Sequence, residues 1–208
     1  MAPAEPGCKR LSDVSARPGS NACAGVQRSH ALQCGVGACA LHHVRAPKVT
    51  TVRTHYLDAS AIVKVLVEED GSDAVRSYLG LHATWVTTSL CFAEVLGVLK
   101  AKQLHRHIST EQYLCACEDL MAHIRGQTIT IEDVGLTERV VFDQVELLCK
   151  RYSLDLSDGC QLLTLRSGQL SHLEGDSRPI LVTADKGLAE AARSEGLRAW
   201  DCMHEPAP

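Results

Sequence analysis

Four acidic residues occupy positions where a carboxylate is unexpected. Asp58 and Asp185 each end an apolar run, in HYLD and in PILVTAD. Glu94 interrupts the apolar segment SLCFAEVLGVLK, and Asp158 opens the segment SDGCQLL. A carboxylate among apolar residues is costly to bury unless it is paired, hydrogen-bonded or bound to a cation. Because all four lie at the ends or on the exposed faces of expected core elements, they predict one shared site for a divalent metal.

The chemistry of these four side chains favours a hard cation. Oxygen ligands without clustered His or Cys select Mg²⁺ or Mn²⁺ over zinc. Such a metal lowers the pKa of its bound water and offsets charge on phosphoryl oxygens, so the pattern predicts metal-assisted attack of water on a phosphodiester. Whether one metal or two would bind is left open. Neighbouring side chains are expected to hydrogen-bond the carboxylates or a metal-bound water: Ser60, Thr88, Thr183 and Asp155.

Each acid also has a simpler interpretation. Asp58 and Asp185 could do no more than cap the helices that follow them. Glu94 could be a surface residue of a wide amphipathic helix, paired with Lys64 or Lys102. Lys64 itself could touch a phosphate, but we expect it to be an ordinary surface lysine.

Asp155 and Asp158 open the same expected helix and need separate interpretations. Asp155 comes first, and its side chain can cap the helix. Asp158 then lies in the first turn, where the helix dipole favours negative charge. We expect Asp155 to be a cap and Asp158 to be a metal ligand, because Asp158 is the one that fits with the other three acids.

The segments that carry these acids alternate regularly from residue 51 onward. Short apolar runs predict strands, and segments with apolar residues at helical spacing follow them. Strands that alternate with helices indicate βαβ units around a mainly parallel sheet. In such sheets ligands bind outside the carboxyl ends of the strands, the edge expected for Asp58 and Asp185. The expected strands are 51–58, 84–88, 128–133, 179–185 and 197–201; the expected helices are 59–69, 72–82, 89–104, 109–124, 136–152, 157–168 and 185–196.

Composition bounds the class of the molecule. Of 208 residues, 45% are hydrophobic and only 4% are aromatic, so the core should be mainly aliphatic, as in an α/β protein. No stretch of about 18 apolar residues predicts a membrane span, and no apolar segment near the start predicts a secretory signal. We interpret the ten cysteines as reduced thiols in the cytoplasm, because many of them lie among apolar residues of expected helices.

The chain divides into unlike parts. Residues 1–49 are rich in Pro, Gly, Ser and Ala and are expected to be a disordered extension outside the domain. Residues 50–204 are expected to form one domain, and 205–208 a short tail. Zinc binding within the extension is a weak alternative, because the spacing of the candidate ligands fits no standard finger. Those candidates are Cys34, Cys39, His42 and His43.

Charge is also divided unevenly. Residues 1–50 carry six Lys or Arg and two Asp or Glu, whereas residues 51–208 carry fifteen and twenty-three. Nucleic-acid affinity comes largely from neutralising phosphates. A nuclease with such an acidic domain would therefore need a local basic patch, a basic partner, or acids concentrated at a metal site.

Residues 54–201 resemble the PIN domain, and most closely the bacterial VapC-type toxins of toxin–antitoxin modules. The motifs that carry the resemblance are YLDASAIVK, VTTSLCFAEV, YSLDLSDGCQLL and LVTADKGLAEAA. The resemblance implies that Asp58, Glu94, Asp158 and Asp185 are catalytic and bind the metal. It also implies a three-layer α/β/α fold with a central, mainly parallel five-stranded sheet. Gly159 departs from the family, which usually has Ala after this Asp.

The function implied by the resemblance is a cytoplasmic endoribonuclease that depends on Mg²⁺ or Mn²⁺. Its partners would be the RNA substrate, a cognate antitoxin and a second copy of the chain. One alternative is a PIN-fold RNA-binding or RNA-processing protein outside a toxin–antitoxin system. Another is a different acid-rich α/β phosphoryl-transfer enzyme. A haloacid dehalogenase-like site needs Asp-x-Asp after the first strand, but residues 58–60 are Asp-Ala-Ser. A receiver-like signalling domain needs an acidic pair before Asp58, and none is present.

Overall fold

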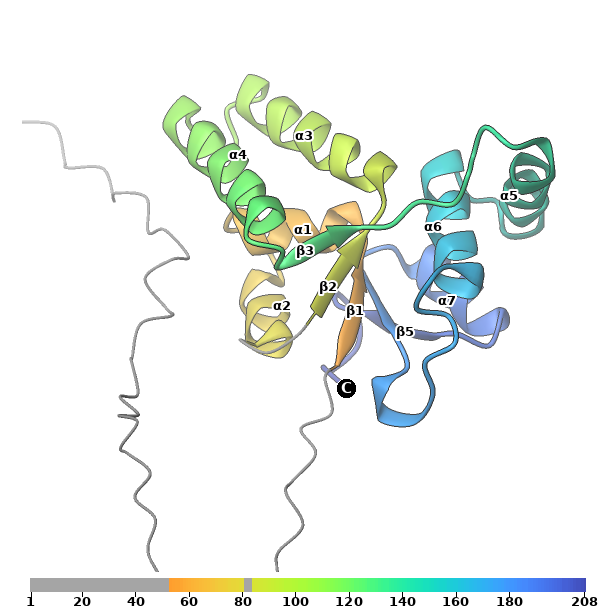
Figure 1. The fold of residues 1–208 in the computed structure, drawn as a ribbon. Helices are drawn as coiled ribbons and strands as arrows, with labels where there is room; N and C mark the ends of the chain where they lie inside the picture. The colour runs from red at the N-terminus through yellow and green to blue at the C-terminus, as the bar shows by residue number, and fades with distance from the viewer. Residues whose placement is uncertain (1–52, 81–83) are drawn as a thin grey trace, which may run out of the picture.

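A computed structural model describes residues 53–80 and 84–208. In this part of the chain, five strands form one sheet in the order β3-β2-β1-β4-β5, and every neighbouring pair is parallel (Figure 1). The predicted five-stranded parallel sheet is therefore confirmed. The expectations for residues 1–49, zinc binding included, lie outside the described residues. The strands are β1 (Thr54–Leu57), β2 (Thr84–Thr87), β3 (Ile129–Ile131), β4 (Ile180–Thr183) and β5 (Arg198–Asp201).

Helices cover both faces of the sheet, which confirms the expected three-layer α/β/α architecture (Figure 1). One face is covered by α1 (Ala59–Leu66), α2 (Ser72–Leu79), α3 (Ser89–Leu104) and α4 (Thr110–Arg125). The other face is covered by α5 (Arg139–Tyr152), α6 (Leu156–Ser167) and α7 (Lys186–Ser194). A short 3₁₀ turn, η2 (Gly175–Ser177), precedes β4.

The central strands are buried on both sides, which explains why they appear in the sequence as short apolar runs. Successive residues of a strand point to opposite faces. Accordingly, Tyr56 and Leu181 pack with α5, α6 and α7, whereas Leu57 and Val182 pack with α1 to α4. The sheet thus separates two mainly aliphatic cores. Asp58 and Asp185 follow the carboxyl ends of the buried strands β1 and β4, at the edge of both cores.

Some helix ends differ from the sequence expectation. The expected helix 59–69 ends at Leu66, because Val67 adopts an extended backbone. The expected helix 72–82 ends at Leu79, since Gly80 has a φ of 57°, a conformation that glycine adopts readily. The helix expected at 89–104 is confirmed as α3, from Ser89 to Leu104.

Gly159 has a packing role. A Cβ at this position would lie 2.4 Å from Sγ of Cys149 and 3.2 Å from Val145, both on α5. The absence of a side chain therefore lets α5 approach α6 closely. This is a physical reason for glycine where the resembled family usually has alanine.

The described cysteines are all free thiols, and three of them are buried: Cys91, Cys160 and Cys202. Among the described helices, none is long and apolar enough to cross a membrane.

Candidate active site at the carboxyl edge of the sheet

The strand order places a crevice where the chain changes direction across the sheet. From β1 the chain moves to β2 and β3 on one side, and it then returns to β4 and β5 on the other side of β1. Open α/β sheets bind ligands outside the carboxyl ends of the strands at such a switch point. A pocket of about 330 Å³ lies there, and it is lined by five of the predicted acids. These are Asp58, Glu94, Asp155, Asp158 and Asp185.

Asp58 directly follows β1 and is held by hydrogen bonds. Its carboxylate accepts from the backbone N–H of Ala59 at 2.6 Å and from the hydroxyls of Ser60 at 2.5 Å and Thr183 at 2.9 Å. The side chain caps α1 and is buried, so burial raises its pKa, although these hydrogen bonds act in the opposite direction. Asp58 is therefore both a cap and a fixed oxygen group at the pocket, and the two interpretations of it are compatible.

Two of the predicted supporting hydroxyls act on this carboxylate, and the third does not. Ser60 Oγ also accepts from the N–H of Ala184, and Thr183 Oγ1 accepts from the N–H of Asp185. These bonds connect the segment after β1 to the segment after β4. Thr88 instead caps α3 by accepting from the N–H of Cys91 at 3.2 Å.

Glu94 lies on the side of α3 that faces the pocket. Its carboxylate accepts a hydrogen bond from Ser157 Oγ at 3.0 Å, which connects α3 to the start of α6. Burial raises its pKa, and the negative charges of Asp58 and Asp155 raise it further.

The alternative partners proposed for Glu94 are occupied elsewhere. Lys64 and Lys102 both pair with Glu69, at 2.8 and 2.6 Å. Lys64 is also buried, so the expectation of a surface lysine is wrong. Within residues 53–80 and 84–208 Glu94 therefore has no lysine partner, and it lines the pocket together with other carboxylates.

Asp155 and Asp158 differ at the start of α6, and the expected cap role of Asp155 is confirmed. Asp155 is the cap, since its carboxylate accepts from the N–H of Asp158 at 2.9 Å. Asp158 is half-buried, and its pKa is raised to about 7. Burial is the largest cause, followed by the charges of Asp58, Asp155, Asp185 and Glu94.

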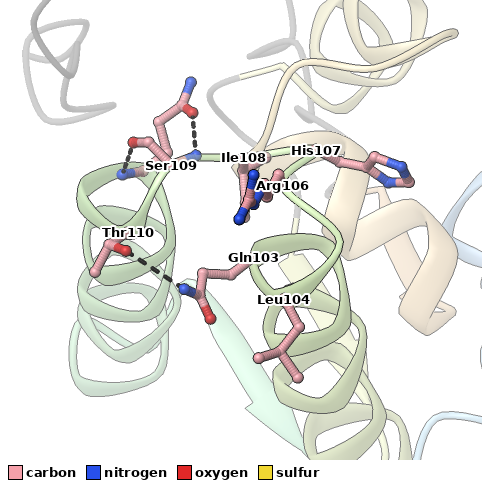
Figure 2. Close-up of a pocket in the computed structure, with 8 residues that line it drawn as sticks. Gln103, Leu104, Arg106, His107, Ile108, Ser109 and Thr110 are labelled. Atoms are coloured by element: carbon pink, nitrogen blue, oxygen red, sulfur yellow. Dashed lines mark hydrogen bonds between the residues drawn. The ribbon is translucent and has the colours of Figure 1, made fainter.

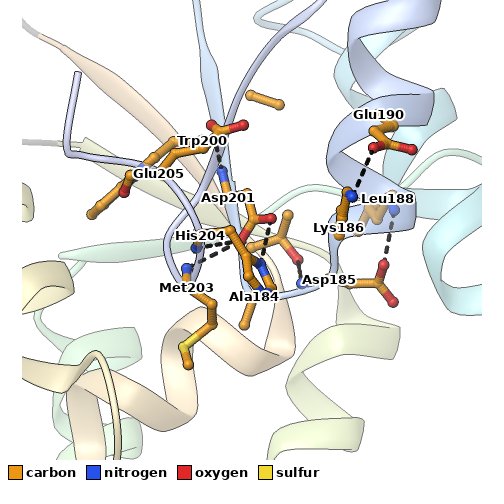
Figure 3. A network of polar contacts seen from close by, with 12 residues as sticks. Ala184, Asp185, Lys186, Leu188, Glu190, Trp200, Asp201, Met203, His204 and Glu205 are labelled. Carbon is orange, nitrogen blue, oxygen red and sulfur yellow. Dashed lines mark hydrogen bonds and ion pairs between the residues drawn. The ribbon is translucent and has the colours of Figure 1, made fainter.

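Asp185 caps α7 and also lines the pocket. Its carboxylate accepts from the N–H of Leu188 at 3.0 Å, as Figure 3 shows. Capping and a place in the acidic pocket therefore occur together in Asp185, as they do in Asp58.

The residues present fit a hard divalent cation in charge and in donor type. Across the described residues, none of the five pocket acids forms an ion pair with a Lys, Arg or His. All offer oxygen donors, which Mg²⁺ and Mn²⁺ prefer. In residues 53–80 and 84–208, however, no three His, Cys, Asp or Glu side chains are close enough together to hold a metal ion. The acids thus share one pocket without converging on one point.

Three contributors to this edge were not predicted from the sequence. Ser157 lies between two recognised acids and positions Glu94. Glu69 lines the pocket and binds both nearby lysines. Asp201 ends β5, as Asp58 follows β1, and the strand-end pattern could have indicated it. Its buried carboxylate accepts from His204 Nδ1 at 2.8 Å, but Asp201 does not line the pocket (Figure 3).

A second pocket lies at the turn between α3 and α4 (Figure 2). Its volume is larger, about 490 Å³, but no carboxylate lines it. Several of its polar groups bond to one another: Gln103 donates to Thr110, and Ser109 and Gln112 form a capping box. The carboxyl-edge pocket is therefore the better candidate for metal-assisted chemistry.

Fold and site together define a three-layer α/β protein with an acidic pocket at the topological switch point. No protein-family model matches the chain. Over 47 residues the chain is 49% identical to Ribonuclease VapC46 of Mycobacterium tuberculosis. This alignment covers 23% of the chain and 36% of the length of that relative. The resemblance to VapC-type PIN-domain proteins is confirmed by this match. The crystal structure of PAE2754 from Pyrobaculum aerophilum superposes with a TM-score of 0.45 and 18% identity, over 72% of this chain and 90% of that one.

Proposed function

We propose that this protein is an endoribonuclease that depends on Mg²⁺ or Mn²⁺ and cleaves RNA phosphodiesters, acting as the toxin of a toxin–antitoxin pair. The observation that carries the proposal is the pocket at the carboxyl edge, where five carboxylates gather without a described cation as partner. The partial identity to a ribonuclease of the VapC type supports the reaction class.

The metal would be held by Asp58, Glu94, Asp158 and Asp185. When bound, a divalent cation lowers the pKa of its water and offsets charge that builds on the phosphoryl oxygens. Within the chain, Ser60 and Thr183 orient Asp58, and Ser157 orients Glu94. The carboxylates would have to move closer together to share one ion, because no three of them are close enough in the described structure.

The raised pKa of Asp158 supports a role in cation binding. A carboxyl group with a pKa of about 7 is partly protonated at neutral pH, because ionisation would place a charge in a partly buried site and beside four other acids. A divalent cation removes this penalty. Metal binding should therefore release protons near neutral pH, in keeping with the coupling of metal affinity to ligand ionisation.

The proposed partners follow from charge and from the resemblance. The acid excess of residues 51–208 suits a basic antitoxin. Homodimer formation and a cytoplasmic location are proposed on the resemblance to VapC-type toxins, and the free thiols are compatible with that location.

The test is cleavage of labelled RNA by the purified full chain in Mn²⁺. We expect cleavage by the wild type and a loss of at least about a hundredfold for Asp58→Asn or Glu94→Gln, since each removes a charged oxygen donor. Asp176→Asn is the control, because Asp176 is exposed in η2 and does not line the pocket. Equal cleavage in excess EDTA would exclude the metal-dependent mechanism.

The toxin role is tested separately by expressing this protein in cells, alone or together with a small basic protein that is encoded beside it. Unchanged growth of cells that express this protein alone would argue against the toxin role.

A further inference from the structure

Acids outnumber cations at the acidic pocket. Lys64 and Lys102 share the single carboxylate of Glu69, Lys186 lies 3.7 Å from Glu190, and five further acids line the pocket. An RNA strand that reaches this pocket therefore meets an excess of negative charge there. Because RNA affinity depends strongly on phosphate neutralisation, a substrate needs cations elsewhere on the molecule.

Three arginines gather at the opposite, amino edge of the sheet. Arg53 immediately precedes β1, Arg178 lies two residues before β4, and Arg198 begins β5. β1, β4 and β5 are neighbouring parallel strands, so their amino ends lie at the same edge of the sheet. The register pairs His55 with Ile180 and Ile180 with Arg198. Arg53 and Arg178, each two residues earlier, are thus level with one another.

These arginines have no acidic partner within the described residues. Arg178 donates to the carbonyl of Gly196, and Arg198 donates to the carbonyl of Arg178 at 3.2 Å. Asp176, the nearest acid in sequence to Arg178, forms no ion pair with it in the described structure. Two exposed guanidinium groups are therefore held beside one another by backbone carbonyls, with their charge uncompensated.

The buried residues behind this edge experience the same positive charge. His55 is fully buried, neither ring nitrogen has a hydrogen-bond partner in the described structure, and its ring centroid lies 5.2 Å from that of Tyr78. Burial, followed by the charges of Arg53 and Arg198, lowers the pKa of His55 to about 4. Burial raises the pKa of Tyr78, and the charges of the same two arginines act in the opposite direction. The hydroxyl of Tyr78 also has no hydrogen-bond partner among the described residues.

A small pocket continues the basic edge toward α6. Its volume is about 190 Å³, and its polar lining includes Arg166, Arg178 and Ser171. The one acid in its lining, Glu195, is satisfied by Arg151, Arg166 and the hydroxyl of Tyr152. With two arginines on a single glutamate, this neighbourhood also retains positive charge.

We propose that the amino edge formed by Arg53, Arg178 and Arg198, with the adjoining Arg166 pocket, binds the phosphodiester backbone of single-stranded RNA. The inference rests on the proposed function only for the identity of the polyanion. Adjacent strands lie about 4.8 Å apart, so three neighbouring strands present charge over about 10 Å. A row of that length suits successive phosphates of one strand better than an isolated phosphate. Arginine is well suited to this role because its fork of donors matches phosphate oxygens.

The test is binding of the full chain to a labelled single-stranded RNA of mixed sequence, measured by fluorescence anisotropy in EDTA over a range of salt. We expect Arg178→Gln/Arg198→Gln to raise Kd about tenfold. The slope of log affinity against log salt should become shallower by about 1.4, since each phosphate contact on a single strand contributes about 0.7. In cleavage assays the same variant should raise KM for long RNA and leave kcat unchanged.

Two controls separate charge from structure. Arg178→Lys/Arg198→Lys keeps both charges while changing the carbonyl contacts, and it should retain the wild-type salt slope. Arg139→Gln/Lys150→Gln removes two exposed cations from α5 and should leave Kd unchanged.

The proposal would be overturned by an unchanged Kd and salt slope in Arg178→Gln/Arg198→Gln, or by equal losses of affinity in that variant and in Arg178→Lys/Arg198→Lys. So would displacement of RNA by inorganic phosphate or AMP at similar concentration, because that indicates a single-phosphate site. If binding behaves as expected but no cleavage occurs in Mn²⁺, the proposed function fails and the binding surface stands.

Discussion

Asp158 is a pocket acid whose pKa is raised to about 7, first by burial and then by the charges of all four of the other predicted acids. In the unfolded chain an aspartate ionises near pH 4. The folded protein therefore holds the proton more tightly than the unfolded chain. The resulting contribution to stability is present below about pH 4 and is lost as the pH rises through 7.

We predict that Asp158→Asn stabilises the metal-free protein at pH 8 by about 1–2 kcal/mol, a figure reduced for solvent screening of a half-exposed group. The gain should shrink at pH 5, where the wild-type carboxyl is largely protonated in the folded state. Urea unfolding in EDTA at both pH values measures the difference. Asp176→Asn is the matched control, since Asp176 is exposed and outside the pocket. A gain for Asp158→Asn that is no larger at pH 8 than at pH 5 would contradict the mutual repulsion.

The positions of single acids could be predicted from the sequence, but their partners could not. Asp58 and Asp185 follow apolar strands and precede helices, and both features are local. The bond between Ser157 and Glu94 joins residues 63 positions apart and depends on the approach of α3 to α6. The pairing of Lys102 on α3 with Glu69 likewise depends on tertiary packing. Long-range contacts of this kind leave no periodic signal.

At the scale of helices and strands, local chemistry determined how well each boundary was anticipated. The start of α4 lies within one residue of the expected helix 109–124, and there Ser109 and Gln112 form a capping box with mutual hydrogen bonds of 3.1 and 2.7 Å. The early ends of α1 and α2 were missed, since the apolar pattern continues past Leu66 and Leu79 while the backbone does not. The order of the strands was not predicted, because it depends on which helix crosses which face.

Gly159 gives a prediction for the contact between α5 and α6. Because an added Cβ would lie 2.4 Å from Sγ of Cys149, Gly159→Ala should lower the free energy of unfolding by about 1–3 kcal/mol through overpacking. Adding Cys149→Ala removes the sulfur and should recover part of the loss, as expected for coupled neighbours. Urea unfolding of both variants measures this.

Gly97 provides the matched control for that experiment. It lies in the interior of α3, and a Cβ there would meet nothing within 4 Å. Gly97→Ala should therefore stabilise the protein by up to about 1 kcal/mol through helix propensity. If Gly159→Ala were also stabilising, the close approach of α5 to α6 would not explain the glycine.

At the scale of the whole molecule, charge is separated along the direction of the strands. Carboxylates collect at the carboxyl edge of the sheet, and arginines without described acidic partners collect at the amino edge. The net charge of residues 51–208 indicated an acidic domain that is poorly suited to binding RNA. A net charge, however, does not show where on the molecule the charged residues lie. The strand order places residues that are far apart in sequence, such as Arg53 and Arg178, next to one another at the ends of adjacent strands.

The collection of carboxylates at the carboxyl edge predicts that a divalent cation stabilises the folded protein. A ligand that binds only the native state stabilises it by about 2.7 kcal/mol at about one hundred times its Kd. Mn²⁺ should therefore raise the midpoint of thermal unfolding of the wild type in a concentration-dependent way, with most of the shift lost in Asp58→Asn and Glu94→Gln. Glu111→Gln is the control: Glu111 is an exposed acid in the first turn of α4 that does not line the pocket, and its variant should keep the full shift. Equal shifts in all four proteins would mean that Mn²⁺ binds elsewhere, and no shift in the wild type would remove the physical basis for placing a metal among these carboxylates.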